Sequence, residues 1–157
     1  MKGHKREEVS IFVEQSFDYS HFLPESDKCF PLHGHTSLVN LEVHGELPPS
    51  GMLMDFGEAK SILGKTLSLL DHKLVTNKRY TKQAEKSSIE VKYDRFSFSL
   101  PSDQVFLLDG EGTSEDIALA ISENLLGKMP DNVIFIRLTI TEGLRKGTIV
   151  KKFRNKQ

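Results

Sequence analysis

The chain has 157 residues, of which 38% are hydrophobic and 27% are charged, a composition typical of a globular protein with one well-formed core. Its formal net charge of −1 excludes a general electrostatic attraction to nucleic acid or to an anionic membrane surface. No apolar run is long enough to span a bilayer, and a single cysteine cannot form an internal disulfide, so we expect a protein of the cytoplasm.

Two long strands are predicted at the start of the chain. Residues 1–7 form a charged lead-in that we expect to be mobile, and apolar and polar side chains then alternate over residues 8–20. The same alternation returns over residues 33–46. The connection at 22–32 contains two prolines and is too long for a tight turn, which is typical of a functional loop.

Two helices are predicted from their caps and from apolar spacing. The first begins after Asp55, a good N-cap residue, and ends near His72; the second begins after Thr113 and stops at Gly127. The spacing of apolar residues predicts two buried stripes, Ala59, Ile62, Leu63, Leu67 and Leu70 in the first helix and Ile117, Ile121 and Leu125 in the second.

The stretch between the helices, residues 76–109, is predicted to be an insertion. Its polar and charged first part, residues 76–87, is typical of a loop. Apolar residues then alternate over 89–93 and again over 96–98, which predicts a small hairpin with its turn between the two runs.

Two further strands are predicted after the second helix, at residues 132–141 and 147–153. The apolar face of the first of them consists of Ile134, Ile136, Leu138 and Ile140. Strands that run together and helices that stand apart predict a single α+β domain over residues 1–157, with an antiparallel sheet.

Three histidines are predicted to meet at one end of the first two strands. His33 and His35 are two residues apart, so in a strand they point the same way, roughly 6–7 Å from each other. His21 continues the odd-numbered apolar row of the first strand, whereas the even-numbered His44 points to the other face. If the strands pair as a hairpin, three imidazoles without a fourth side chain predict a catalytic zinc site with one open position.

Two other interpretations of these histidines stay open. His21, His33 and His35 could be ordinary half-buried polar residues. Alternatively, Cys29 could act as a fourth ligand and close a structural zinc site, because it lies only four residues before His33.

Three further groups could carry chemistry. Cys29 next to a metal ion could act as a thiolate base, or it could be a small buried hydrophobic residue. Asp71 and His72 could form a proton relay, or His72 could simply interact with the dipole of the helix that it ends. Glu142 could bind a ligand with two parallel N–H donors, such as a pterin, or be a solvated turn residue before Gly143.

Five motifs in this order resemble the 6-pyruvoyl-tetrahydropterin synthase family, which includes the 6-carboxy-tetrahydropterin synthase of the queuosine pathway. They run through most of the chain and are specific in combination. They are Phe-x-x-x-His at 17–21, Cys-x-x-x-His-Gly-His at 29–35, Gly-Met-x-Met-Asp-Phe at 51–56, Leu-Asp-His at 70–72 and Thr-x-Glu at 113–115.

The resemblance implies the tunnelling fold, or T-fold, an α+β subunit with two helices on one face of a four-stranded antiparallel sheet. Here a small hairpin would be inserted, because residues 76–109 are longer than the usual link between the helices in that family. The resemblance also implies trimers that close into a barrel, hexamers of two trimers, and active sites at the subunit interfaces.

The resemblance implies a role for nine residues. His21, His33 and His35 correspond to the ligands of Zn²⁺, and Cys29 corresponds to the catalytic thiol, with Asp71 and His72 as its relay partners. Three residues would contact the pterin substrate, Glu142 as its anchor and Thr113 and Glu115 in the lining of its pocket.

The implied reaction is zinc-dependent and starts from 7,8-dihydroneopterin triphosphate. The Cys-x-x-x-His-Gly-His spacing resembles the branch of the family, a lyase, that forms 6-carboxy-5,6,7,8-tetrahydropterin with loss of acetaldehyde and triphosphate. The alternatives are the pyruvoyl branch, which eliminates triphosphate without cleaving the side chain, an aldolase-like cleavage of dihydroneopterin, and a non-enzymatic assembly domain stabilised by zinc.

Overall fold

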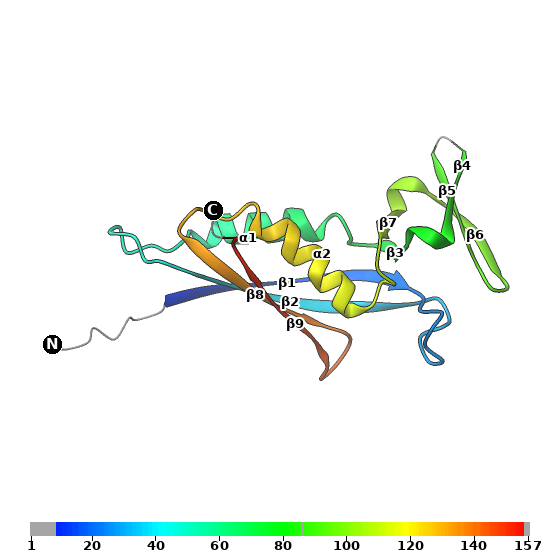
Figure 1. Cartoon of the computed structure of the whole chain (residues 1–157), viewed down its shortest axis with the longest axis horizontal. Helices are drawn as coiled ribbons and strands as arrows, with labels where there is room; N and C mark the ends of the chain where they lie inside the picture. The colour runs from blue at the N-terminus through cyan, green and yellow to red at the C-terminus, as the bar shows by residue number, and fades with distance from the viewer. Residues whose placement is uncertain (1–8, 86, 156–157) are drawn as a thin grey trace.

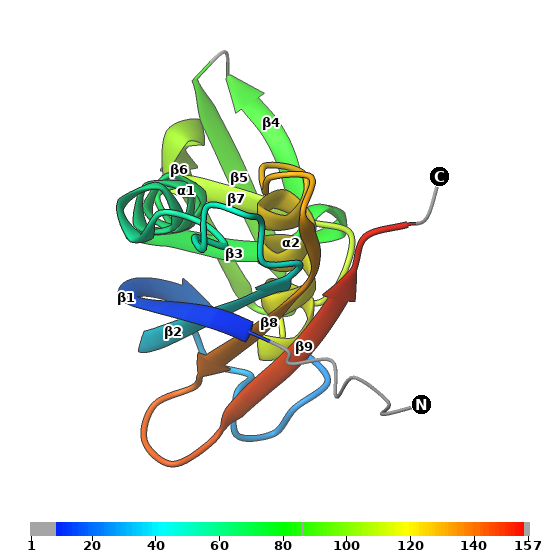
Figure 2. The same ribbon diagram turned by 90° about the vertical axis from the view of Figure 1, so that its left-hand side faces the viewer.

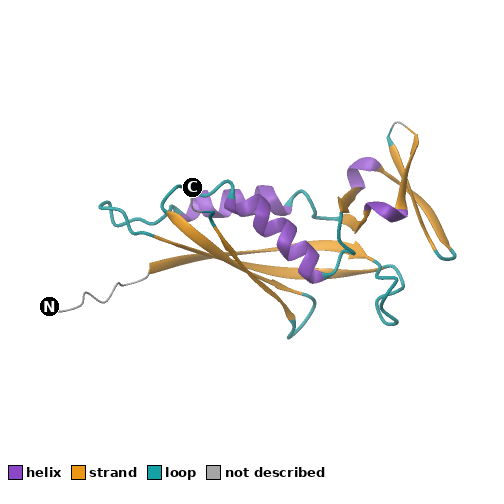
Figure 3. Cartoon of the chain, viewed as in Figure 1, coloured by secondary structure: helices purple, strands orange, loops and turns teal. Residues whose placement is uncertain are grey.

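The computed structural model describes residues 9–85 and 87–155, so the predicted mobile lead-in lies outside the described residues. Figure 3 distinguishes the two helices from the strands, and two short 3-10 turns lie at Lys78–Tyr80 and Ser102–Gln104. The elements are β1 (Val9–His21), β2 (His33–Gly45), α1 (Phe56–Leu67), β3 (Lys73–Asn77), β4 (Thr81–Glu85), β5 (Ser88–Tyr93), β6 (Phe96–Pro101), β7 (Val105–Leu108), α2 (Ser114–Leu126), β8 (Val133–Thr141) and β9 (Gly147–Phe153).

A six-stranded sheet in the order β7-β3-β1-β2-β8-β9 forms one layer, and α1 and α2 cover one of its faces (Figures 1 and 2). The main core lies between the two layers, and both predicted helical stripes contribute to it. The predicted α+β class with two helices on one face is therefore confirmed. No helix among the described residues is long and apolar enough to cross a membrane.

The β1–β2 hairpin follows the predicted alternation. Its register pairs Val9 with Gly45 at one end and His21 with His33 at the other. From Val13 onward the odd-numbered side chains of β1 are buried, except Gln15, which is only partly buried, whereas Phe12 on the opposite face is 61% exposed. His44 points to the opposite face too, as predicted, and its ring stacks on that of Phe135.

Both helix starts are confirmed by their caps. The Asp55 carboxylate accepts a hydrogen bond from the Glu58 N–H at 3.0 Å, and the Thr113 hydroxyl accepts one from the Asp116 N–H at 3.2 Å. The first helix ends at Leu67, earlier than predicted, and turns continue the chain to His72.

The prediction of a four-stranded sheet with a loop at residues 76–87 is wrong in detail. Two short strands, β3 and β7, extend the sheet beyond β1, and both run parallel to it. Parallel strands are covered on both faces and need not alternate, so the pattern of alternation does not detect them. In β3 the polar Thr76 and Asn77 are buried like their apolar neighbours. The loop was predicted because polar residues such as these are typical of loops.

The insertion is larger than the predicted hairpin. The β5–β6 pair is present, with Asp94 of its turn at a φ of 46°, but β4 adds a third antiparallel strand. This small sheet extends beyond the ends of β3 and β7, on the side where the loop after β1 emerges (Figure 1).

One residue of the predicted apolar face of β8 faces solvent. Ile134 is 48% exposed, whereas the other three predicted residues are buried. The pairing with β2 passes from His44–Phe135 directly to Gly45–Val133, so a bulge at Ile134 turns its side chain outward.

Candidate active site

Three imidazoles converge at the end of the β1–β2 hairpin, as predicted. The ring centroid of His21 lies 4.6 Å from that of His33 and 5.1 Å from that of His35, and the centroids of His33 and His35 are 4.9 Å apart. One ligand nitrogen from each ring lies within 4.8 Å of the other two. The convergence follows from strand register, because His21 pairs directly with His33 while Tyr19 pairs with His35.

Backbone carbonyls orient two of the rings. His21 Nδ1 lies 2.8 Å from the Gly112 carbonyl oxygen, and His33 Nδ1 lies 2.7 Å from that of Pro31. A carbonyl oxygen only accepts, so Nδ1 must carry the proton in both rings. In the neutral form each Nε2 then presents a lone pair, and metal-binding histidines are usually oriented in this way by a hydrogen bond from the other ring nitrogen.

The spacing of the nitrogen atoms in this cluster suits a bound cation. The Nε2 atoms of His21 and His33 are 3.1 Å apart, close to the roughly 3.3 Å expected between two nitrogens on a tetrahedral Zn²⁺ ion. Burial lowers the pKa of His21 and of His35, so both rings favour the neutral form that binds metal. His35 Nε2 is buried without a hydrogen-bond partner among the described residues. The donor set therefore fits zinc.

Cys29 lies in the loop beside this cluster rather than inside it. Among the described residues, the group of nearby ligand atoms contains the three histidines and not the Cys29 thiol, which is partly exposed. The Cys29 carbonyl accepts a hydrogen bond from the Leu23 N–H at 2.8 Å. Burial raises the pKa of the Tyr19 hydroxyl, and the charges of Glu142 and of the Cys29 thiol add to that shift.

Glu142 lies next to the histidines. Its carboxylate is 3.7 Å from His35 Nε2 and 3.8 Å from Lys146 Nζ, and its side chain is only 16% exposed. Its own N–H donates to the Lys146 carbonyl across the β8–β9 turn. This environment differs from that of the solvated turn residue considered as the alternative, and Lys146 is a neighbour that the linear pattern did not reveal.

The segment before α2 forms another side of the site. The Asp116 carboxylate accepts hydrogen bonds from the Gly112 N–H and the Thr113 hydroxyl at 3.1 and 3.2 Å, and thereby fixes the carbonyl that holds His21. A Cβ atom on Gly110 would lie 2.4 Å from this carboxylate, so a larger residue there would displace the carboxylate from its present position. Glu115, in contrast, is exposed on the first turn of α2, and its carboxylate accepts a hydrogen bond from the Ser114 hydroxyl at 3.4 Å.

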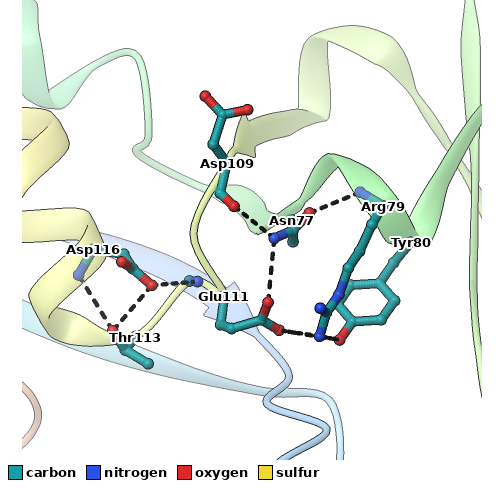
Figure 4. A network of polar contacts seen from close by, with 8 residues as sticks. Asn77, Arg79, Tyr80, Asp109, Glu111, Thr113 and Asp116 are labelled. Atoms are coloured by element: carbon teal, nitrogen blue, oxygen red, sulfur yellow. Dashed lines mark hydrogen bonds and ion pairs between the residues drawn. The ribbon is translucent and has the colours of Figure 1, made fainter.

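Glu111 connects this segment to the insertion (Figure 4). Its carboxylate accepts hydrogen bonds from Arg79 at 2.9 Å, from the Tyr80 hydroxyl at 3.0 Å and from the Asn77 amide at 3.3 Å. Asn77 also donates to the Asp109 carbonyl at 2.8 Å. These side chains were not predicted as functional, because residues more than 30 positions apart meet here only through the parallel pairing of β3 with β7.

Asp71 and His72 lie on the other side of the sheet from the histidine cluster. His72 Nδ1 is 3.0 Å from the Asp71 carboxylate, and His72 Nε2 is 4.0 Å from that of Asp18. Asp18 and His21 have opposite parity in β1, so their side chains point to opposite faces. Burial raises the pKa of Asp71, but hydrogen bonds from the Asp18 N–H and His72 outweigh that effect and lower it overall.

The backbone of His72 is strained. Its φ is 58°, in the left-handed region, and its N–H donates to the Asp18 carbonyl at 2.6 Å. Its side chain is 76% exposed, so packing of the ring does not explain why a non-glycine residue occupies this position. Strained backbone conformations of this kind are concentrated at functional sites of proteins.

We expect His72→Gly to be more stable than His72→Ala by about 1 kcal/mol, because both lose the imidazole but only glycine adopts this φ without a steric cost. Urea unfolding of the two variants measures the difference. An alanine variant as stable as the glycine variant would contradict the strain.

Comparisons with known proteins agree on one family. A model described as 6-pyruvoyl tetrahydropterin synthase matches residues 10–152. A putative 6-carboxy-5,6,7,8-tetrahydropterin synthase of Pyrococcus abyssi is 35% identical over 138 residues, which cover 86% of this chain and 85% of the relative. A 6-carboxy-5,6,7,8-tetrahydropterin synthase of Haemophilus influenzae is 31% identical, with 82% and 89% of the two chains covered.

Solved structures show the same fold. The structure of Plasmodium falciparum 6-pyruvoyl tetrahydropterin synthase superposes with a TM-score of 0.80 at 25% identity, and the match covers 94% of this chain and 99% of the other. The predicted T-fold is therefore confirmed.

Proposed function

Since the chain belongs to the 6-pyruvoyl tetrahydropterin synthase family, we propose that it is a zinc-dependent enzyme that converts 7,8-dihydroneopterin triphosphate to 6-carboxy-5,6,7,8-tetrahydropterin, with loss of acetaldehyde and triphosphate. The observation that carries the proposal is the convergence of three imidazoles, two of which, His21 and His33, have their Nδ1 atoms held by backbone carbonyls. The names of the two relatives favour the carboxy product.

His21, His33 and His35 would hold Zn²⁺, which supplies Lewis-acid chemistry by lowering the pKa of the hydroxyl groups on the substrate side chain. Cys29 would take up a proton as a thiolate, since a thiolate rather than a thiol is the effective base. Glu142 would accept hydrogen bonds from the N–H edge of the pterin. Its short distance to His35 supports this role, because the pterin ring and the side chain of one small substrate must be bound at the same time by Glu142 and by the metal site.

Asp71 and His72 would serve a site on a neighbouring subunit. The relay on one chain and the histidine cluster of the same chain face opposite sides of β1, which favours a site assembled from two copies. This arrangement agrees with the oligomeric assembly that the family implies. The protein would thus be inactive as a single chain and would work as a trimer or hexamer in the cytoplasm.

Co-expression of a Cys29→Ala chain with a His72→Ala chain tests this assignment. Each variant alone should be inactive, whereas a random mixture should recover about a quarter of wild-type turnover, because half of the thiols and half of the relays are intact independently. Turnover of mixed oligomers no higher than that of the separate variants would contradict a shared site.

The product identifies the reaction. The purified, zinc-loaded protein should release triphosphate from 7,8-dihydroneopterin triphosphate, and mass spectrometry should detect 6-carboxy-5,6,7,8-tetrahydropterin and acetaldehyde. A pyruvoyl product would assign the other branch, and cleavage of unphosphorylated dihydroneopterin alone would assign an aldolase-like activity. Without turnover of any of these substrates, the enzymatic proposal fails.

A further inference from the structure

A second apolar cluster joins the insertion to the loop that carries Cys29. The loop spans residues 22–32, between β1 and β2. Phe22 directly follows His21, Phe30 directly follows Cys29, and both aromatic side chains enter this cluster. Its buried members are Phe22, Leu74, Ile89, Val91, Tyr93 and Val105, with Phe30, Tyr80, Phe96, Phe98, Leu100 and Leu107 packed against them.

The aromatic rings of this cluster contact one another in defined geometries. The fully buried Phe22 ring stacks on Tyr93 with centroids 3.7 Å apart and an interplanar angle of 3°. Phe30 meets Tyr93 at 5.7 Å and Phe96 at 5.8 Å, both edge to face. The Tyr93 hydroxyl also donates to the Phe30 carbonyl at 3.4 Å.

In the part of the chain that the structure describes, the loop makes few other hydrogen bonds near the thiol. The hydrogen bond from the Leu23 N–H to the Cys29 carbonyl closes it on itself, and the Cys29 N–H lies 3.4 Å from the Ser26 hydroxyl. Asp27 and Lys28, directly before Cys29, are exposed. The direction of the thiol therefore depends on where the Phe30 ring is held.

We propose that Tyr93 and Phe96 of the inserted sheet are positioning residues for Cys29, which act through Phe22 and Phe30. The insertion is then a brace for the loop that carries the thiol rather than a separate appendage. The effect on turnover rests on the proposed function, but the effect on the thiol itself does not.

The experiment compares Phe96→Leu with Phe98→Leu. Both phenylalanines lie on the same face of β6 and both pack against the cluster, but of these two only Phe96 makes a ring contact with Phe30 in the described part of the chain. Cys29 is the single cysteine of the chain, so the rate of alkylation by iodoacetamide, measured over a range of pH, reports this thiol alone.

We expect Phe96→Leu to change the alkylation rate at least about threefold and to shift its pH profile, because a loosened loop alters the exposure and surroundings of the thiol. We expect kcat to fall about tenfold with KM nearly unchanged, since misplacement of a catalytic group by a fraction of an ångström costs rate rather than binding. Phe98→Leu should leave all three quantities within about twofold of wild type.

Equal effects of the two variants on alkylation, or a wild-type rate in Phe96→Leu, would overturn the proposal. If Phe96→Leu folds poorly, Tyr93→Phe removes only the hydroxyl that donates to the Phe30 carbonyl, and an unchanged alkylation profile there would overturn it as well. A wild-type protein that turns over no pterin refutes the proposed function, yet the alkylation comparison still decides the positioning role.

Discussion

His33→Ala should lose bound zinc and, with it, at least about 1,000-fold of turnover, because two remaining imidazoles cannot replace a three-ligand site. His33 is the best ligand to remove, since it is only partly buried, whereas His21 is fully buried and its loss would leave a cavity beneath Gly112. The zinc content of purified protein, measured by atomic emission, and turnover of 7,8-dihydroneopterin triphosphate give the two readouts.

His44→Gln is the matched control, because it also removes one imidazole from β2, but from the face opposite to His33. It should keep one zinc per chain and turnover near that of wild type. Full zinc occupancy and full turnover in His33→Ala would contradict the metal site. Loss of zinc in His44→Gln would show that the assay reports general damage to β2.

Cys29→Ala should keep its zinc and lose about 100- to 10,000-fold of turnover, the range expected when a positioned acid or base is removed. We expect zinc to stay bound because, among the described residues, the cluster of ligand atoms consists of three histidine nitrogens and contains no sulfur. The same two measurements apply, and unfolding in urea checks that the variant is folded.

Cys29→Ser sharpens this test, because serine keeps the size and a proton but its hydroxyl ionises far less readily than a thiol. We expect it to be nearly as inactive as the alanine variant. Loss of zinc from Cys29→Ala would instead indicate a closed site with four ligands, and the non-enzymatic assembly domain would become the better explanation of the histidines.

The local sequence pattern was sufficient to predict much of the secondary structure. Asp55 and Thr113 were predicted as helix caps because a short polar side chain satisfies free backbone N–H groups within three residues, and both caps are present. The odd-numbered row ending at His21 was predicted because alternation in a strand is a local property. Where the local rule was broken by a bulge, at Ile134, the prediction was wrong.

Contacts between distant residues needed the tertiary structure. Asp18 beside His72 and Glu111 beside Asn77 join positions more than 30 residues apart and leave no periodic signal. The same holds for β3 and β7, because a test for alternation does not detect the parallel pairing of β3 with β1 and of β7 with β3.

The sequence alone therefore determined which imidazoles share a face and which motifs they belong to, because a strand repeats every two residues and a two-stranded hairpin has few possible registers. Only the tertiary structure decided which groups surround them: a carbonyl from the loop before α2 on one ring, Glu142 beside another, and the Asp71–His72 pair on the far face. These neighbours come from separate elements, and their meeting depends on how the layers pack rather than on any spacing along the chain.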